Sequence, residues 1–134
     1  MKEQISYEIA QNEVEKWLSK NRIKASKRKA SEPVIESLID AVMYGQIVFD
    51  SETLAITQHL DFPLGEDSSL KTLTYKDRIT KKEVDDKLSA MKNKDGSASI
   101  TAYVAALTLQ PVAIIDKLDT RDYSISQSIA VFFI

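Results

Sequence analysis

The sequence predicts an α+β fold with N-terminal helices, a small three-stranded antiparallel meander and a C-terminal bundle of short helices. Two observations carry this prediction. Apolar residues recur at helical spacing on both sides of the middle of the chain, whereas residues 46–76 hold three short strand-like runs separated by turns. Strands in this order, joined by short turns, pair as an antiparallel meander. We expect one domain over residues 1–134, with residues 1–30 forming a basic N-terminal arm and helix.

The composition is that of an ordinary globular domain. With 134 residues, 43% of them hydrophobic and 28% charged, the chain can bury a core without disulfides or a structural metal. It has no cysteine, which excludes disulfides, thiolate zinc sites and cysteine nucleophiles. No apolar run approaches the roughly 18 residues of a membrane-spanning helix, and the N-terminus has no signal-peptide core. We therefore expect a cytoplasmic protein without membrane contact.

The net charge of −2 conceals an uneven distribution. Residues 1–30 hold eight Lys and Arg against four Asp and Glu, whereas residues 31–70 hold eight acids and neither Lys nor Arg. Residues 71–134 are nearly balanced. A basic arm followed by an acidic block favours pairing of the two segments, within one chain or between copies. We therefore expect a homo-oligomer.

The first predicted helix begins at a capping box formed by residues 12–15. There Glu15 can reach back to the backbone of Asn12, so we place the helix over residues 12–20. The only tryptophan, Trp17, is expected in the core. Just before this helix, three alternating apolar residues fit either a short strand or an earlier helical turn, namely Ile5, Tyr7 and Ile9.

A second helix is predicted from Ser31 to Gly45. A capping serine, an acid and a proline occupy its first turn, which is a typical helix start. Its apolar face runs through Leu38 to Met43. Gly45 supplies the left-handed residue that ends it.

Between these helices lies a strongly basic segment, residues 20–29. Six of its ten residues are cationic: Lys20, Arg22, Lys24, Lys27, Arg28 and Lys29. One interpretation is a solvated, mobile linker. The other is contact with phosphate groups or with an acidic partner. Because no aromatic residue is interleaved for base stacking, the nucleic-acid version of this contact is disfavoured.

Three strands are predicted after the second helix, over residues 46–49, 53–62 and 70–76. Asp50 begins the first turn, and a polar loop separates the second and third strands. The second strand alternates apolar and polar residues, but Gln58 lies in its apolar row. The pattern alone gives no reason for a glutamine at that place.

The remainder of the chain predicts four helices. Thr80 begins a capping box with Glu83, and residues 95–96 close that helix. Ser99 is expected to cap the next helix, and Pro111 ends it and opens a short third one. Three residues are candidates to cap the last helix: Asp119, Thr120 and Asp122.

The last helix carries an apolar face up to the end of the sequence. Its members are Ile125, Ile129, Phe132, Phe133 and Ile134. A final turn this apolar, with no C-cap, needs a surface that buries it. We hypothesise that these side chains bind a partner or a second copy. The alternative is that the helix completes the monomer core.

No residue pattern indicates an enzyme. His59 falls on the second strand opposite the apolar row, where no nucleophile or acid is indicated as its partner. Asp116, Asp119 and Asp122 recur every three residues, but a turn divides them and the spacing is not that of a calcium loop. With three glycines, the chain has no phosphate-binding loop or nucleophile elbow. We expect neither catalysis nor a cofactor or metal.

Several short segments resemble the tail assembly chaperones of long-tailed bacteriophages. In the middle of the chain they are IVFD at 47–50, LDFP at 60–63 and LTYKDRIT at 73–80. Toward the end they are YVAAL at 103–107, PV at 111–112, ID at 115–116, LD at 118–119, RDY at 121–123 and FF at 132–133. The resemblance covers about residues 32–134 and leaves the basic arm outside.

The resemblance implies a protein of the bacterial host cytoplasm that coats the long, hydrophobic tape-measure protein and keeps it soluble. Such chaperones help to recruit tail-tube subunits and do not enter the virion. In many of these families a translational frameshift appends a second domain to some copies, and an end in the middle of a helix fits that arrangement. The apolar face of the last helix is then the expected contact with the tape-measure protein or with another copy.

A small regulatory nucleic-acid-binding protein that acts through residues 20–29 is the alternative. DNA recognition by the C-terminal helices as a helix-turn-helix is disfavoured, because residues 123–134 contain no Lys or Arg to face the groove. We therefore expect nucleic acid to be an unlikely partner of this protein. The alternative predicts steeply salt-dependent binding to DNA or RNA.

Overall fold

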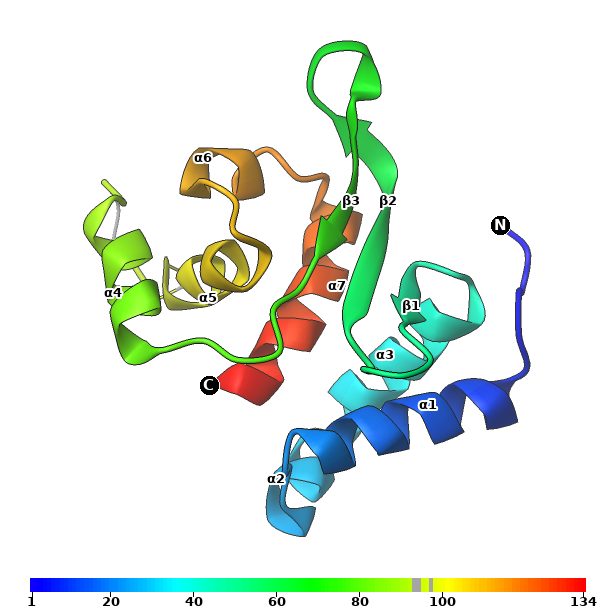
Figure 1. Ribbon diagram of the computed structural model, residues 1–134. Coiled ribbons are helices and arrows are strands. Elements are labelled where there is room, and N and C mark those ends of the chain that lie inside the picture. The colour runs from blue at the N-terminus through cyan, green and yellow to red at the C-terminus, as the bar shows by residue number, and fades with distance from the viewer. Residues whose placement is uncertain (93–94, 97) are drawn as a thin grey trace.

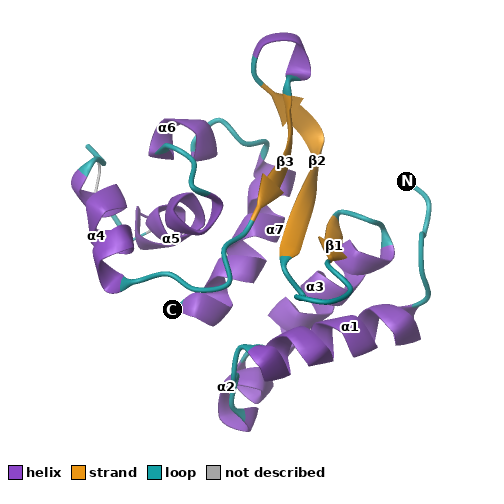
Figure 2. Cartoon of the chain, viewed as in Figure 1, coloured by secondary structure: helices purple, strands orange, loops and turns teal. Residues whose placement is uncertain are grey.

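A computed structural model describes residues 1–92, 95–96 and 98–134, and it confirms the α+β fold. Helices precede and follow a three-stranded antiparallel sheet (Figure 2). Two single turns of 3-10 helix lie at Glu66–Ser68 and Val131–Phe133. The other elements are α1 (Tyr7–Lys20), α2 (Ala25–Ala30), α3 (Glu32–Met43), β1 (Ile47–Phe49), β2 (Ile56–Leu64), β3 (Leu70–Thr74), α4 (Lys81–Ser89), α5 (Ala98–Thr108), α6 (Val112–Ile115) and α7 (Thr120–Ala130).

The β2–β3 hairpin stands between two groups of helices (Figure 1). α1, α2 and α3 form one group, and α4, α5 and α6 form the other. α7 lies between them and contacts α3, α5 and β2. α7 is therefore the helix through which the two groups and the sheet are joined.

The sheet has the strand order β1-β2-β3, with β2 in the centre. β1 is short and pairs with β2 only from Ile56 to Gln58. β2 and β3 pair regularly up to His59, and the register then shifts before Leu64 pairs with Leu70. Beyond the end of β1, the outer half of β2 therefore has a neighbouring strand on one side only.

The main core is built from α1, α3, α5, α7 and one face of the sheet. Trp17 lies in it, as the sequence predicts, with its ring centroid 6.3 Å from Phe49, 5.9 Å from Phe132 and 6.0 Å from Phe133. Aromatic pairs at these distances stabilise a core beyond the area they bury. The largest fully buried apolar side chains are Leu18, Leu38, Ile39, Ile47, Leu73, Leu107, Ile115, Ile129, Val14 and Val104.

The N-terminal helix begins earlier than the capping box predicts. α1 starts at Tyr7, and the Ser6 hydroxyl accepts a hydrogen bond from the Ile9 backbone N–H at 3.3 Å. Asn12 lies inside the helix, so its assignment as the cap was wrong. Ser6, six residues upstream, provides the cap instead; Tyr7 and Ile9 lie in the first turns of the helix, and Ile5 precedes it.

The basic segment is not a mobile linker, because residues 25–30 form the helix α2. The Arg28 guanidinium holds this helix to its neighbours. Its Nε donates to the Ile23 carbonyl at 3.0 Å, and its Nη1 lies 2.7 Å from the Glu15 carboxylate. One inward-facing arginine thus fixes a segment whose composition alone indicates a linker.

The second predicted helix is confirmed as α3, which ends where Gly45 adopts a φ of +77°. Pro33 lies in the first turn, but the Ser31 side chain makes no capping hydrogen bond. β2 begins later than predicted, because a turn uses residues 50–53. In that turn the Asp50 carboxylate accepts from the backbone N–H groups of Glu52 and Thr53.

In the C-terminal half, Thr80 caps α4 as predicted by accepting from the Glu83 backbone N–H. α4 then ends at Ser89, well before residues 95–96, because hydrogen bonds from residue i to i−3 tighten its last turn. Ser99 lies inside α5 and is therefore not its N-cap. Among the three candidate caps of the last helix, Asp119 caps α7.

Candidate functional site

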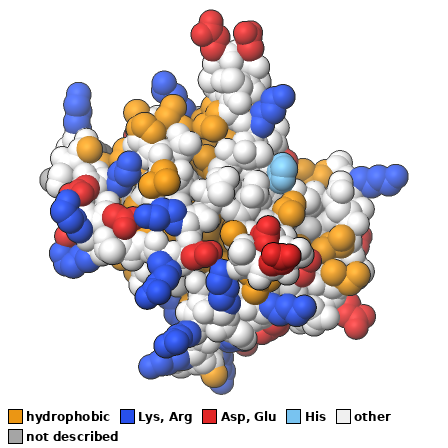
Figure 3. Space-filling view, viewed as in Figure 1, with side chains coloured by type: hydrophobic (Ala, Val, Ile, Leu, Met, Phe, Trp, Pro, Cys, Tyr) orange, Lys and Arg blue, Asp and Glu red, His pale blue; other side chains and the backbone are white. Residues whose placement is uncertain are grey.

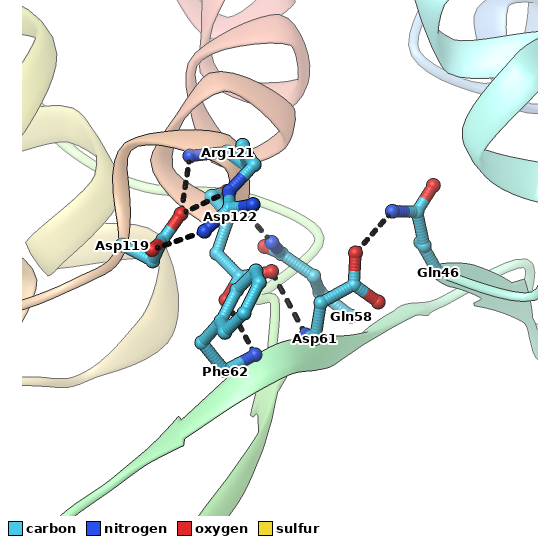
Figure 4. Close-up of polar contacts among 7 residues, drawn as sticks. All are labelled: Gln46, Gln58, Asp61, Phe62, Asp119, Arg121 and Asp122. Atoms are coloured by element: carbon cyan, nitrogen blue, oxygen red, sulfur yellow. Dashed lines mark hydrogen bonds and ion pairs between the residues drawn. The ribbon is translucent and has the colours of Figure 1, made fainter. Parts of the chain in front are cut away.

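The most elaborate polar site in the described chain lies where β2 crosses the first turns of α7 (Figure 4). We call it the β2–α7 junction and define it by Gln58, Asp61, Phe62, Tyr75, Asp119, Arg121, Asp122 and Ser126. Gln58, Asp122 and Ser126 are completely buried. About 60 residues of sequence separate the strand from the helix that it meets.

Gln58 is the centre of the buried part. Its side-chain amide donates to the Asp122 backbone carbonyl at 2.9 Å. Its side-chain carbonyl accepts from the Tyr75 hydroxyl at 2.6 Å and from the Ser126 hydroxyl at 2.8 Å. Burial raises the pKa of Tyr75, which keeps its hydroxyl protonated as a donor. The glutamine in the apolar row is therefore a satisfied connection between β2, β3 and α7.

Asp122 takes the place of a missing strand. Its two carboxylate oxygens accept from the backbone N–H groups of Asp61 and Phe62, at 2.9 Å and 3.0 Å. In a regular strand, consecutive N–H groups point to opposite edges of the strand. The N–H groups of Asp61 and Phe62 can both reach Asp122 because β2 is distorted by the register shift after His59. Because β1 has ended at this point, a helix side chain satisfies donors that would otherwise have no partner.

The exposed rim of the junction combines a cation, a carboxylate and an aromatic ring. Arg121 forms a two-point contact with Asp119, with Nε to Oδ1 at 2.9 Å and Nη2 to Oδ2 at 3.0 Å. The same guanidinium lies 4.0 Å from the centroid of the Phe62 ring, which is 40% exposed. Hydrogen bonds from the Arg121 side chain and backbone lower the pKa of Asp119 to about 2.

The polar groups of the junction are paired with one another and with the backbone. Gln46 extends the rim by donating from its side-chain amide to the Asp61 carboxylate at 2.7 Å. Each Asp122 carboxylate oxygen accepts from one backbone N–H, and the Ser126 hydroxyl donates to Gln58. Within this described cluster no nucleophile is paired with a general base. The rim presents an aromatic ring and charged groups at the surface.

The structure separates the five side chains predicted to bind a partner. Ile129 is fully buried and Phe132 is 6% exposed, and both belong to the main core. Ile125 and Phe133 are half-buried, and only Ile134 is largely exposed, at 58%. Ile134 is therefore the member of the set that a partner would meet most directly. Partner binding by this set remains a prediction.

Phe133 also borders a recess of about 380 Å³ between α4 and α5. Its apolar lining includes Ile79, Val84 and Tyr103. The end of the chain thus lies beside an apolar depression as well as on the main core.

The predicted basic patch is also divided. The Lys20 ammonium lies 3.1 Å from the Asp77 carboxylate and donates to the Thr53 carbonyl. Arg28 is turned toward Glu15, as described for α2. The other four cations lie at the surface around α2, with Arg22, Lys24 and Lys29 exposed and Lys27 half-buried. Of the six predicted cations, these four have no ion pair with an acidic side chain in the described part of the chain.

His59 is exposed on β2, as the alternation of that strand predicts. The three aspartates at intervals of three residues have separate environments, because Asp119 pairs with Arg121 while Asp122 is buried under β2. Over residues 1–92, 95–96 and 98–134, no three His, Asp or Glu side chains gather as metal ligands. The same part of the chain contains no helix of the length and apolarity needed to cross a bilayer.

Sequence reasoning missed the junction although one signal was available. Gln58 interrupts an apolar row, and a buried glutamine requires partners for its amide. Two segments that carry the resemblance meet here, residues 60–63 on β2 and residues 121–123 on α7. Comparison of the chain with known protein families, curated proteins and solved structures finds no match.

Proposed function

We propose that this protein is a bacteriophage tail assembly chaperone of the host cytoplasm. It binds and solubilises the tape-measure protein and helps to recruit tail-tube subunits during tail morphogenesis. The observation that carries the proposal is the meeting of two resemblance segments at the β2–α7 junction. LDFP at 60–63 and RDY at 121–123 are joined by the Asp122 carboxylate and by the contact of Arg121 with Phe62. Two of the segments that carry the resemblance therefore belong to one structural unit of this chain.

Exposed apolar side chains support the same role. Leu109 is 71% exposed at the end of α5, and half-buried Val112 and Ile114 lie close to it in sequence. Figure 3 shows hydrophobic side chains gathered over the region of α6. A chaperone for a long hydrophobic helix needs apolar surface of this kind. Ile134 provides a second such point at the end of α7.

The test is co-expression with the tape-measure protein encoded by the same phage or prophage. We expect the tape-measure protein to be insoluble alone, and to be soluble and to copurify with this chain when both are present. Leu109→Ser combined with Ile134→Ser should lower the soluble fraction, because both changes remove exposed apolar contacts without touching the core.

Val48→Ser is the matched control, because Val48 is an exposed apolar residue on β1, away from both points. The double variant and the control should both keep the thermal stability of the parent chain. If the parent chain leaves the tape-measure protein insoluble and does not copurify with it, the proposed function is wrong.

A nucleic-acid-binding role is the second candidate, favoured by the exposure of Arg22, Lys24 and Lys29 around α2. It predicts DNA or RNA binding that weakens steeply with salt. Lys24→Gln combined with Lys29→Gln should abolish that binding, while Lys71→Gln combined with Lys117→Gln should not. Salt-independent or absent binding in a fluorescence anisotropy titration would exclude this role.

A further inference from the structure

The helix α2 presents cations to the surface and contributes no buried side chain. Lys24 and Lys29 are exposed, and Figure 3 shows Lys and Arg side chains gathered at the end of the molecule where α2 lies. A helix of six residues has little stability of its own. Its position is set by Arg28, which leaves the outward face of α2 free to meet another surface.

The neighbouring helix α3 presents a row of acids. Glu32, Glu36 and Asp40 follow one another at intervals of four residues, so they lie on one face, and all three are exposed. Like charges at this spacing repel one another. In the described chain no Lys or Arg forms an ion pair with any of the three, and the Tyr7 hydroxyl donates to Glu36 at 2.7 Å. The row therefore lacks the cations that would relieve its repulsion.

The basic helix and the acidic row border one recess of about 550 Å³ between α1, α2 and α3. Ala25 and Lys29 line it from α2, Glu32 and Glu36 line it from α3, and Ile35 forms part of its floor. The recess thus places opposite charges side by side around an apolar floor. A surface of this kind is self-complementary, because a two-fold rotation brings the basic half of one copy onto the acidic half of the other.

We propose that a second copy of this chain docks at this recess, with α2 of each copy against Glu32, Glu36 and Asp40 of the other. The contact is isologous, so it closes a dimer and uses both charged halves at once. The recess favours a second copy over nucleic acid, because phosphates bound at Lys29 would meet Glu32 and Glu36 beside it. The inference concerns association between copies and does not rest on the proposed chaperone role.

The first experiment measures the mass of the full chain by sedimentation velocity at low and high salt. We expect a dimer at about 50 mM NaCl whose dissociation constant rises at least about tenfold by about 0.5 M, because salt screens exposed charges. A chain that is monomeric at both salt concentrations would overturn the proposal. So would a dimer whose dissociation constant does not respond to salt.

Charge reversal then locates the contact. One variant carries Lys24→Glu and Lys29→Glu, and the other carries Glu36→Lys and Asp40→Lys. Each should be monomeric alone, because both charged halves then have the same sign. An equimolar mixture should form a heterodimer, since each half of one variant is complementary to a half of the other.

The matched controls make the same changes in charge elsewhere, at exposed residues. They are Lys71→Glu with Lys117→Glu, and Glu52→Lys with Glu66→Lys, and they should remain dimeric. Thermal unfolding checks that every variant is folded. If the two α2 and α3 variants stay dimeric, or if their mixture stays monomeric, the proposal is overturned.

Discussion

The β2–α7 junction and the helix α4 are attached to the rest of the fold in opposite ways. At the junction, Gln58, Asp122 and Ser126 are fully buried, and their polar groups have partners on β2, β3 or α7. α4 buries one side chain, Val84, and otherwise displays exposed ion pairs such as Lys82 with Asp86 at 2.9 Å. The first region depends on buried hydrogen bonds and the second on a small apolar contact with surface charge.

This difference determines which regions of the fold resist unfolding. A buried polar group that loses its partner is costly, whereas an exposed ion pair is worth about 0–1 kcal/mol. Val84 packs with Ala102 and Ala106 of α5 in a small cluster of its own. α4 should therefore open locally before the main core, while loss of the junction should affect the whole domain.

Asp122→Ala should have the largest effect. It removes an acceptor from the backbone N–H groups of Asp61 and Phe62, and hydrogen bonds to charged groups contribute about 1.5–3 kcal/mol each. Both donors are only partly buried, so water relieves part of the cost. We expect the free energy of unfolding in urea to fall by about 2–4 kcal/mol.

Two variants sharpen this prediction. Asp122→Asn keeps one acceptor but turns an amide donor toward the second N–H group. Its free energy of unfolding should therefore lie between those of the parent chain and Asp122→Ala. Asp116→Ala changes an exposed aspartate at the end of α6 and should cost less than about 0.5 kcal/mol. A loss of similar size for Asp116→Ala and Asp122→Ala would contradict the role given to the junction.

The local part of this architecture could be predicted from the sequence. The end of α3 at Gly45 and the cap of α4 at Thr80 follow from rules that involve only a few neighbouring residues. The three strands and their order follow from turn chemistry and alternation. These features need no knowledge of distant parts of the chain.

The junction could not be predicted in this way. Asp122 fits the sequence rules as a capping residue, and its actual partners at 61 and 62 depend on where β1 ends and how β2 is distorted. Ile129 and Phe132 likewise have the pattern of an exposed apolar end, and they become core because Trp17 lies beside Phe132 and Phe133. Each case depends on contacts across 60 residues or more.

Val84→Ala should have a smaller and more local effect. The change removes two buried methyl groups from the contact of α4 with α5, at a cost of about 1–2 kcal/mol. Amide hydrogen exchange should speed up in α4 and stay unchanged in α7. Lys82→Ala removes only an exposed ion pair. The free energy of local opening of both helices should therefore stay within about 0.5 kcal/mol of that in the parent chain. Faster exchange across α7 in Val84→Ala would show that α4 is not a separate unit.

Arg121→Gln should have the smallest effect, because it changes only the exposed rim of the junction. The pKa of Asp119 is lowered from 3.8 to about 2, chiefly by the Arg121 side chain and then by the Arg121 backbone N–H. A lowered pKa in the folded state means that this carboxylate stabilises the fold above about pH 4 and loses that contribution as the pH falls toward 2.

In Arg121→Gln the pKa of Asp119 should rise part of the way toward 3.8, because the backbone N–H remains as a donor. A carbon-detected NMR titration of the aspartate carboxyl groups measures this shift. The stability near pH 7 should hardly change, since solvent screens the rim while the buried bonds of Asp122 remain. If Arg121→Gln instead destabilised the fold as much as Asp122→Ala, the exposed rim would contribute as much stability as the buried bonds. The distinction between buried hydrogen bonds at the junction and weak exposed ion pairs on α4 would then be wrong.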